Sequence, residues 1–273
     1  MVVNGAVEGS NVAIEATAGN VKATSDIAAT VTDVKIKAGR DAELAKLTAN
    51  GLGVVDVVAK NNATLNGEAS ATMVSVKAQE GDVVANEAIT ATHTLELRAG
   101  RDATVNGPLE ASVAIVEAKN NALIDGAVSA NAVAITATEG DLVVKGAVAA
   151  NDGSGKFVAG QDVKIVKDGN VSAKGDLTVE AGRDITSESD IASTEGKVAL
   201  DAKNAISVEG EVSAAENVDL MATDGNVKVT KAITSTDESV TIKAGHDVDV
   251  KDVSAGRALA INAGQDVDTG ALT

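Results

Sequence analysis

The residues with the clearest capacity for chemistry are aspartates and asparagines that recur about once every twenty residues. Four of the aspartates, Asp82, Asp102, Asp162 and Asp184, each follow a short apolar run that contains an alanine. Carboxylates from adjacent copies of a stacked repeat would lie about 5 Å apart, where like charges raise each other's pKa and a Ca²⁺ ion could relieve the repulsion. Calcium binding is one hypothesis for these residues. The hypothesis we favour is that they shape a corner of the fold and form a solvated ladder.

Other catalytic or metal chemistry has little support in the sequence. The two histidines, His93 and His246, are far apart in the chain, and the absence of cysteine excludes disulfides and thiolate sites. An enzyme built on a repetitive β-fold would need clustered acids in a groove made by long excursions, and successive repeats differ in length by only three residues. The tripeptide Lys174-Gly175-Asp176 matches an integrin-binding motif, which chance explains at this length. We therefore predict a protein without enzymatic activity or cofactor, with Ca²⁺ as the one alternative.

Charge and hydropathy exclude two classes of partner. The net charge of −17 would repel a phosphate backbone, so we expect no binding to nucleic acid. No stretch reaches the roughly 20 apolar residues of a membrane-spanning helix, and Met1 to Ser10 does not resemble a secretory signal.

The recurring aspartates belong to a repeat that runs along the whole chain. Each copy contains a segment of the type V-x-I-x-A, and the residue two positions before the alanine is apolar in every copy, as in a strand with one buried face. Successive alanines are 19 to 22 residues apart. The thirteen anchoring alanines are Ala16, Ala38, Ala59, Ala78, Ala99, Ala118, Ala137, Ala159, Ala181, Ala202, Ala222, Ala244 and Ala263.

Each copy continues with a polar corner and two further short strands. The second strand is exemplified by residues 162–165, and the third, of the type G-x-V-x-A, by residues 210–214. Corners such as A-G-x-D contain glycine, aspartate or asparagine, which admit positive φ or accept hydrogen bonds from nearby backbone amides. We expect these residues at the corners for such local reasons.

Three strands and three corners in about 21 residues predict one coil of a parallel β-solenoid. The predicted fold is all-β, a right-handed triangular β-helix of about 13 coils of 19–22 residues, forming a single continuous domain over residues 1–273. Stacking would align Ile36, Val57, Val76 and Leu97 in one column. With no Trp or Tyr and one Phe, the core must consist of small aliphatic side chains. A left-handed hexapeptide helix and a calcium-binding nonapeptide roll do not fit the period or the motif.

Residues 177–185 (LTVEAGRDI) and 240–248 (VTIKAGHDV) carry a family resemblance. They resemble the shaft repeats of filamentous haemagglutinins and related large bacterial exoproteins, and the resemblance covers practically the whole chain. It implies a right-handed β-helix, export through a dedicated partner pore of the outer membrane, and a role as a surface stalk or adhesin.

The sequence therefore favours a non-catalytic structural protein, an extracellular or cell-surface bacterial rod that serves as an adhesin shaft or a fibre subunit. Its expected partners are its own ends, either stacked head to tail or continued in a longer shaft, and a host-cell or cell-surface ligand. The alternative is a carbohydrate-binding or polysaccharide-cleaving β-helix that uses an outer face. A groove with converging acids would favour the alternative, and evenly distributed charge would favour the shaft.

Overall fold

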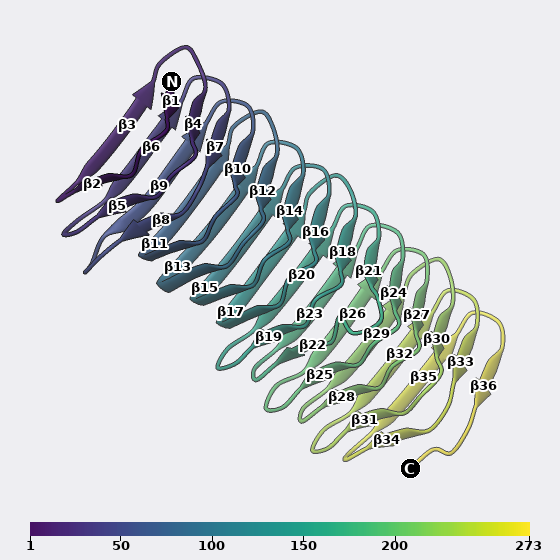
Figure 1. Ribbon diagram of the computed structural model, residues 1–273. Helices are drawn as coiled ribbons and strands as arrows, with labels where there is room; N and C mark the ends of the chain where they lie inside the picture. Colours follow the sequence, from purple (N-terminus) through teal and green to yellow (C-terminus); the bar gives the residue numbers. More distant parts are fainter. The chain divides into compact units, whose positions relative to one another are not determined.

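The computed structural model describes all 273 residues, and its regular elements are all β-strands. The chain folds as a parallel β-solenoid of about 13 coils, as the repeat predicts. It divides into two compact units, residues 1–130 and residues 131–273. Within each unit, a coil contributes one strand segment to each of three columns, and in β11, β13, β15 and β17 two of these segments are joined in one strand (Figure 1). The handedness of the coil and the triangular cross-section stay predictions.

The first column contains the V-x-I-x-A segments. In unit 1 it comprises β3 (Val12–Ala16), β6 (Val34–Ala38), β9 (Val54–Ala59) and the second halves of β11 (Ala69–Ala78), β13 (Ile89–Ala99) and β15 (Leu109–Ala118). In unit 2 it comprises the second part of β17 (Val128–Ala137), then β20 (Gly155–Ala159), β23 (Leu177–Ala181), β26 (Val198–Ala202), β29 (Val218–Ala222), β32 (Val240–Ala244) and β35 (Leu259–Ala263).

The second column contains the short strands that follow the polar corner. Its members in unit 1 are β1 (Val2–Val3), β4 (Val21–Ala23), β7 (Ala42–Leu44), β10 (Ala63–Leu65), β12 (Val83–Ala85), β14 (Ala103–Val105) and β16 (Ala122–Ile124). Its members in unit 2 are β18 (Leu142–Val144), β21 (Val163–Ile165), β24 (Ile185–Ser187), β27 (Ile206–Val208), β30 (Val227–Val229), β33 (Val248–Val250) and β36 (Val267–Thr269).

The third column contains the G-x-V-x-A segments. In unit 1 these are β2 (Val7–Gly9), β5 (Ile27–Ala29), β8 (Leu47–Ala49) and the first parts of β11, β13 and β15. In unit 2 they are β19 (Val148–Ala150), β22 (Val171–Ala173), β25 (Ile191–Ser193), β28 (Val212–Ala214), β31 (Ile233–Ser235) and β34 (Val253–Ala255).

One predicted corner is replaced by continuous strand in part of unit 1. β11 and β13 run for 10 and 11 residues through the junction between the third segment and the next first segment, with a register irregularity between Ala71 and Met73 and between Thr90 and Thr94. The linking residues there are threonine, methionine and histidine, with neither glycine nor proline. They favour extended backbone, and the chain bends without a separate turn.

The core consists of the inward-facing side chains of all three columns. The predicted stack of Ile36, Val57, Val76 and Leu97 is confirmed, because these residues are paired in register and fully buried. In unit 2 the same column contains Phe157, the only aromatic residue of the chain. No buried side-chain polar atom lacks a hydrogen-bond partner.

The expected reason for the corner glycines is wrong. Gly51 is the only glycine with positive φ, at 65°, so the A-G-x-D corners do not use left-handed backbone. Their glycines are needed because stacked corners approach closely: a Cβ on Gly182 would lie 2.1 Å from the carbonyl oxygen of Gly160 in the preceding coil. Any larger residue at such a position would force two coils apart.

Candidate functional site

The recurring aspartates and asparagines form a hydrogen-bonded ladder within each unit, here called the corner ladder, and in unit 2 it is interrupted at Ala205, which has no side-chain acceptor. In each step a side-chain oxygen accepts a hydrogen bond from the backbone N–H of the equivalent residue in the next coil, at N···O distances of 2.9 to 3.3 Å. Its members are Asn20, Asp41, Asn62, Asp82, Asp102 and Asn121 in unit 1, and Asp141, Asp162, Asp184, Asn226, Asp247 and Asp266 in unit 2, with Ala205 in the equivalent position of one coil. The acceptor side chain therefore serves the next coil, and not its own corner as expected.

The four predicted cation ligands are all members of the corner ladder, and two of them are also paired with arginine. Arg101 donates to both carboxylate oxygens of Asp82, through Nε at 3.0 Å and Nη2 at 2.7 Å. Arg183 contacts both oxygens of Asp162 in the same way. Both arginines occupy the variable position of A-G-x-D, and bidentate geometry makes these the strongest pairs of the corner.

Asp102 and Asp184 accept hydrogen bonds but form no ion pair with an arginine. Asp102 accepts hydrogen bonds from the backbone N–H and the side-chain amide of Asn121, at 2.9 and 3.0 Å. Asp184 accepts one from the backbone N–H of Ala205 at 2.9 Å. Each of the four carboxylates thus has at least one oxygen committed to the adjacent coil.

These contacts act on the pKa values of the paired aspartates. The Arg101 guanidinium lowers the pKa of Asp82, assisted by the backbone N–H of Asp102 and opposed by partial burial. Arg183 and the N–H of Asp184 lower the pKa of Asp162 in the same manner. The expectation that neighbouring carboxylates would raise each other's pKa is therefore wrong for Asp82 and Asp162. In both residues the hydrogen bonds from an arginine and from a backbone N–H favour the charged carboxylate, and the net shift of the pKa is downward.

No set of three Asp, Glu or His side chains is arranged so that it could hold a metal ion. The aspartates of the corner ladder follow one another along a line and direct an oxygen at backbone, whereas Ca²⁺ takes six to eight converging oxygens. Calcium binding by Asp82, Asp102, Asp162 and Asp184 stays a prediction.

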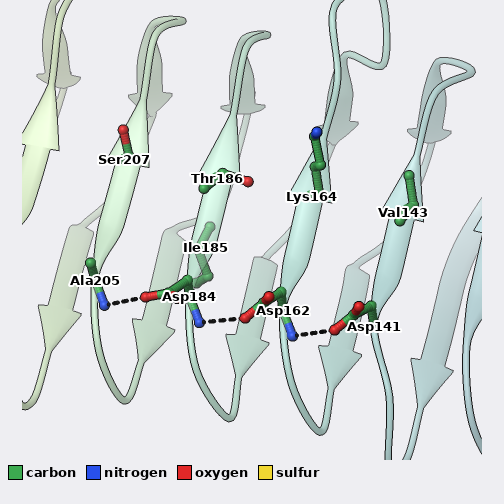
Figure 2. Close-up of a pocket in the computed structure, with 9 residues that line it drawn as sticks. All are labelled: Asp141, Val143, Asp162, Lys164, Asp184, Ile185, Thr186, Ala205 and Ser207. Atoms are coloured by element: carbon green, nitrogen blue, oxygen red, sulfur yellow. Dashed lines mark hydrogen bonds between the residues drawn. The ribbon is translucent and has the colours of Figure 1, made fainter.

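In unit 2 the corner ladder borders a shallow hollow of about 250 Å³, which lies on the outer face of β18, β21, β24 and β27. Figure 2 shows Asp141, Asp162 and Asp184 in succession along one side, each bonded to the next coil, and Lys164 and Thr186 on the adjoining strands. The lining combines carboxylates, hydroxyls and one lysine with the apolar side chains of Val143, Ile185 and Ala205, and it contains no histidine or cysteine. It could accept a polar ligand, and it has no nucleophile activated by a neighbouring base.

The tripeptide Lys174-Gly175-Asp176 has a structural role. Lys174 Nζ lies 3.0 Å from Asp152 Oδ1 and 3.8 Å from Glu195 Oε2, which are in the preceding and following coils. Asp176 accepts a hydrogen bond from the backbone N–H of Lys197 at 3.2 Å. These contacts connect three coils at the corner before the first column.

Sequence reasoning missed an acidic row on the outer face of the first column. Glu180 and Asp201 are paired in register on β23 and β26, and no cation contacts Asp201. Asp201 is exposed on the outer face of β26, where limited desolvation by its neighbours, followed by the charge of Glu180, raises its pKa. Hollows of about 330 and 230 Å³ lie on either side of Asp201, one lined by Glu180 and Lys203, the other by Asp219 and Met221. In an alignment of the residue immediately before each anchoring alanine, this row consists of Glu180 and Asp201 alone, with Val158 and Met221 in the coils before and after.

An asparagine ladder was also missed. The side-chain amide of Asn86 donates to Asn66 Oδ1 at 3.0 Å, and that of Asn106 donates to Asn86 Oδ1 at 2.8 Å. All three asparagines follow the second strand of their coils. Stacked amides of this kind satisfy one another's hydrogen-bonding groups at a second corner, and they carry no charge.

Comparison with known proteins adds no family. No family model matches the chain, and neither a curated protein nor a solved structure matches it. The structure contains no helix with the length and apolar character needed to cross a bilayer.

Proposed function

We propose that this chain is a non-catalytic structural protein, an extracellular bacterial β-solenoid that serves as a rigid adhesin shaft or as a building block of a fibre. The observation that carries this proposal is the uniformity of the bonding between coils. In both units the same three parallel strand pairings recur from coil to coil, and the corner ladder recurs with them. A catalytic site would require at least one coil that differs from its neighbours, whereas a spacer requires coils that are alike.

Rigidity follows from how each coil is held. Its backbone hydrogen bonds go to the coils before and after it, and its aliphatic side chains stack on equivalent side chains. A coil cannot bend away without breaking both sets of contacts together. The net charge of −17 keeps the long polar surface soluble and discourages non-specific contact with other acidic surfaces.

The resemblance of residues 177–185 and 240–248 to filamentous haemagglutinin shafts supports the bacterial surface location. Export through an outer-membrane partner pore and presentation of a tip to a host-cell or cell-surface ligand follow from that resemblance. Parallel coils also leave unpaired strand edges where a stack stops, and these edges can pair with another solenoid. Head-to-tail association, or continuation into a longer shaft, is therefore part of the proposal.

Electron microscopy and small-angle scattering of the purified chain over a concentration series test the structural role. We expect stiff, elongated particles of constant width that lengthen by end-to-end addition as concentration rises. Compact particles, or particles that flex freely within a unit, would contradict the role as a rigid spacer. Val179→Asp, which places a carboxylate in the core, should abolish the stiff particles, and Thr178→Asp on the outer face of the same strand should preserve them.

One observation favours the alternative, a carbohydrate-binding or polysaccharide-cleaving β-helix. Asp201 lies between two hollows on the outer face of β26, and its pKa is raised by limited desolvation and by the charge of Glu180, so it is the carboxyl group of this face that a sugar ligand could engage. Titration calorimetry with neutral and acidic polysaccharides, together with assay of their cleavage, tests this alternative. Binding or cleavage that is lost in Asp201→Asn and retained in Asp56→Asn, the same change on the outer face of β9 and outside both hollows, would favour it over the shaft.

A further inference from the structure

Unit 1 carries a row of exposed apolar side chains along one corner. Away from the chain ends, five large apolar residues are exposed, and four of them lie on this corner, with exposed fractions of 61%, 87%, 43% and 37%. They are Val31, Leu52, Met73 and Val113, which we name the apolar ridge. The fifth, Met221, lies in unit 2 on the outer face of β29.

The ridge residues belong to the same corner of five consecutive coils, in which the fourth coil contributes Thr94 instead of an apolar residue. A Cβ on Gly51 would lie 3.4 Å from the carbonyl oxygen of Val31, which places the Leu52 loop against the Val31 corner. The hydroxyl of Thr72 donates to the carbonyl oxygen of Gly51 at 3.0 Å, which joins that loop to the coil of Met73.

Strand pairing continues the row beyond this loop. Met73 pairs in register with Thr94, and Thr94 pairs with Val113. From Val31 to Val113 the chain advances four coils, so the ridge is about 20 Å long.

Local backbone structure projects Leu52 outward. Gly51 adopts φ 65°, and the N–H of Gly53 donates to the carbonyl oxygen of Asn50 at 3.1 Å, which closes a tight turn with Leu52 at its tip. Gly53 faces the carbonyl oxygen of Thr32 so closely that a Cβ would lie 1.9 Å from it. Two glycines are thus required to hold a leucine in solvent, where its side chain contributes nothing to the core.

The ridge is also without formal charge. Residues 30–32, 50–54, 72–74, 92–94 and 112–114 contain no Asp, Glu, Lys or Arg. The equivalent corners of unit 2 are charged from residue 152 onward and carry ion pairs such as Lys174 with Asp152 and Arg257 with Glu238. Only unit 1 therefore presents a neutral, apolar line on a chain with a net charge of −17.

We propose that the apolar ridge of unit 1 is a lateral self-association surface that packs against the same ridge of a second copy of this chain. Two copies repel each other through faces that carry the excess of carboxylates, and they can approach without that repulsion along the neutral ridge. The ridge has no charge with which to attract a basic or an acidic partner. Its complement is another uncharged apolar line of equal length, which a second copy supplies through a two-fold axis.

This pairing is side by side and does not use the strand edges at the ends of a stack. It is therefore separate from the head-to-tail association in the proposed function, and either can fail alone. A single row of side chains buries little area, so the pair is expected to be weak and dependent on concentration.

Sedimentation equilibrium of the full chain over a wide concentration series tests the proposal. If end-to-end addition is absent, the parent should approach twice the monomer mass, and if it is present, lateral pairing should double the mass of each end-to-end species. In either case Leu52→Asp should raise the dissociation constant of the lateral pair at least about tenfold, because each pair would bury two carboxylates. Met221→Asp makes the same chemical change at an exposed apolar residue outside the ridge and should associate like the parent. Leu52→Met keeps an apolar tip and should also associate. Far-UV circular dichroism checks that each variant folds.

Three results would overturn the proposal. The parent could remain monomeric at every concentration. Leu52→Asp and Met73→Asp could associate as strongly as the parent, which would assign self-association to another surface, such as the strand edges. The parent could remain monomeric and co-float with neutral phosphatidylcholine vesicles, which would assign the ridge to a lipid surface.

Discussion

The pair Gly155 and Phe157 gives a quantitative test of how the solenoid core is packed. Phe157 is fully buried and lies in register between Ile135 and Val179. A Cβ on Gly155 would lie 2.9 Å from Leu177 Cδ1 and 3.2 Å from Phe157 Cε2. Most other coils have Val or Leu at the position of Gly155, so the phenyl ring occupies space that a branched side chain fills elsewhere.

Each single substitution should therefore be destabilising, and the double substitution should recover much of the loss. Gly155→Val overfills the coil and should cost about 1–3 kcal/mol of unfolding free energy. Phe157→Leu leaves part of the ring volume empty; because complete truncation of a buried Phe costs about 3–5 kcal/mol, the partial truncation should cost about 1–3 kcal/mol. In the double variant the valine enters the vacated space, and we expect a favourable coupling energy of about 1–3 kcal/mol.

Urea unfolding of the parent, both single variants and the double variant, followed by far-UV circular dichroism, measures this coupling. Hydrogen exchange of β20 and β23 shows whether the change is local, because repeat proteins can open coil by coil. If the losses of the two single variants simply add in the double variant, Gly155 and Phe157 do not share a packing site and the explanation is wrong.

Three further predictions concern the core, the corner ladder and the acidic row. Val179→Asp should lower stability by more than about 4 kcal/mol by placing an unpaired charge in the core, and a thermal melt like that of the parent would show that Val179 does not face inward. Asp184→Ala should cost about 0.5–1.5 kcal/mol because the N–H of Ala205 loses its acceptor, whereas Asp184→Asn should be nearly neutral; equal urea midpoints for both variants would contradict the ladder. The raised pKa of Asp201 means that folding favours its protonated form. The contribution of Asp201 to the free energy of unfolding is therefore complete below the ordinary pKa of 3.8 and is lost as the pH rises through the pKa of the folded state. Asp201→Asn should accordingly stabilise the protein at pH near 7 and not below about 3, which urea midpoints at the two pH values measure. Stabilisation of equal size at both pH values would show that the effect does not come from the charge of Asp201.

The coil and its register could be read from the sequence because each depends on a pattern that recurs in every repeat. The apolar residue two positions before the anchoring alanine has one role, to face the core, so Ile36, Val57, Val76 and Leu97 could be placed in one column in advance. The polar corner could be located for the same reason, since aspartate and asparagine recur where no core residue fits.

What the sequence did not predict depends on contacts between coils that have no local signature. The acceptor role of Asp162 toward Asp184 joins residues 22 positions apart, whereas corner rules describe neighbours in the chain. The place of Gly155 is intelligible only once the Phe157 ring is seen beside it. The apolar ridge was missed because single exposed apolar residues are ordinary, and only their alignment across coils makes them a surface.

The corner ladder gives the solenoid a chemical direction. In a parallel strand pairing both faces of a coil offer donors and acceptors, but in the corner ladder the side-chain acceptors all face the following coil and the amide donors all face the preceding one. Where a segment inverted end over end meets the stack, the corner-ladder contact of that junction would place oxygen opposite oxygen or N–H opposite N–H. The stack is consequently vectorial: every repeat that carries a ladder acceptor distinguishes its upstream from its downstream side, and two segments can be joined with this bond intact in one orientation only.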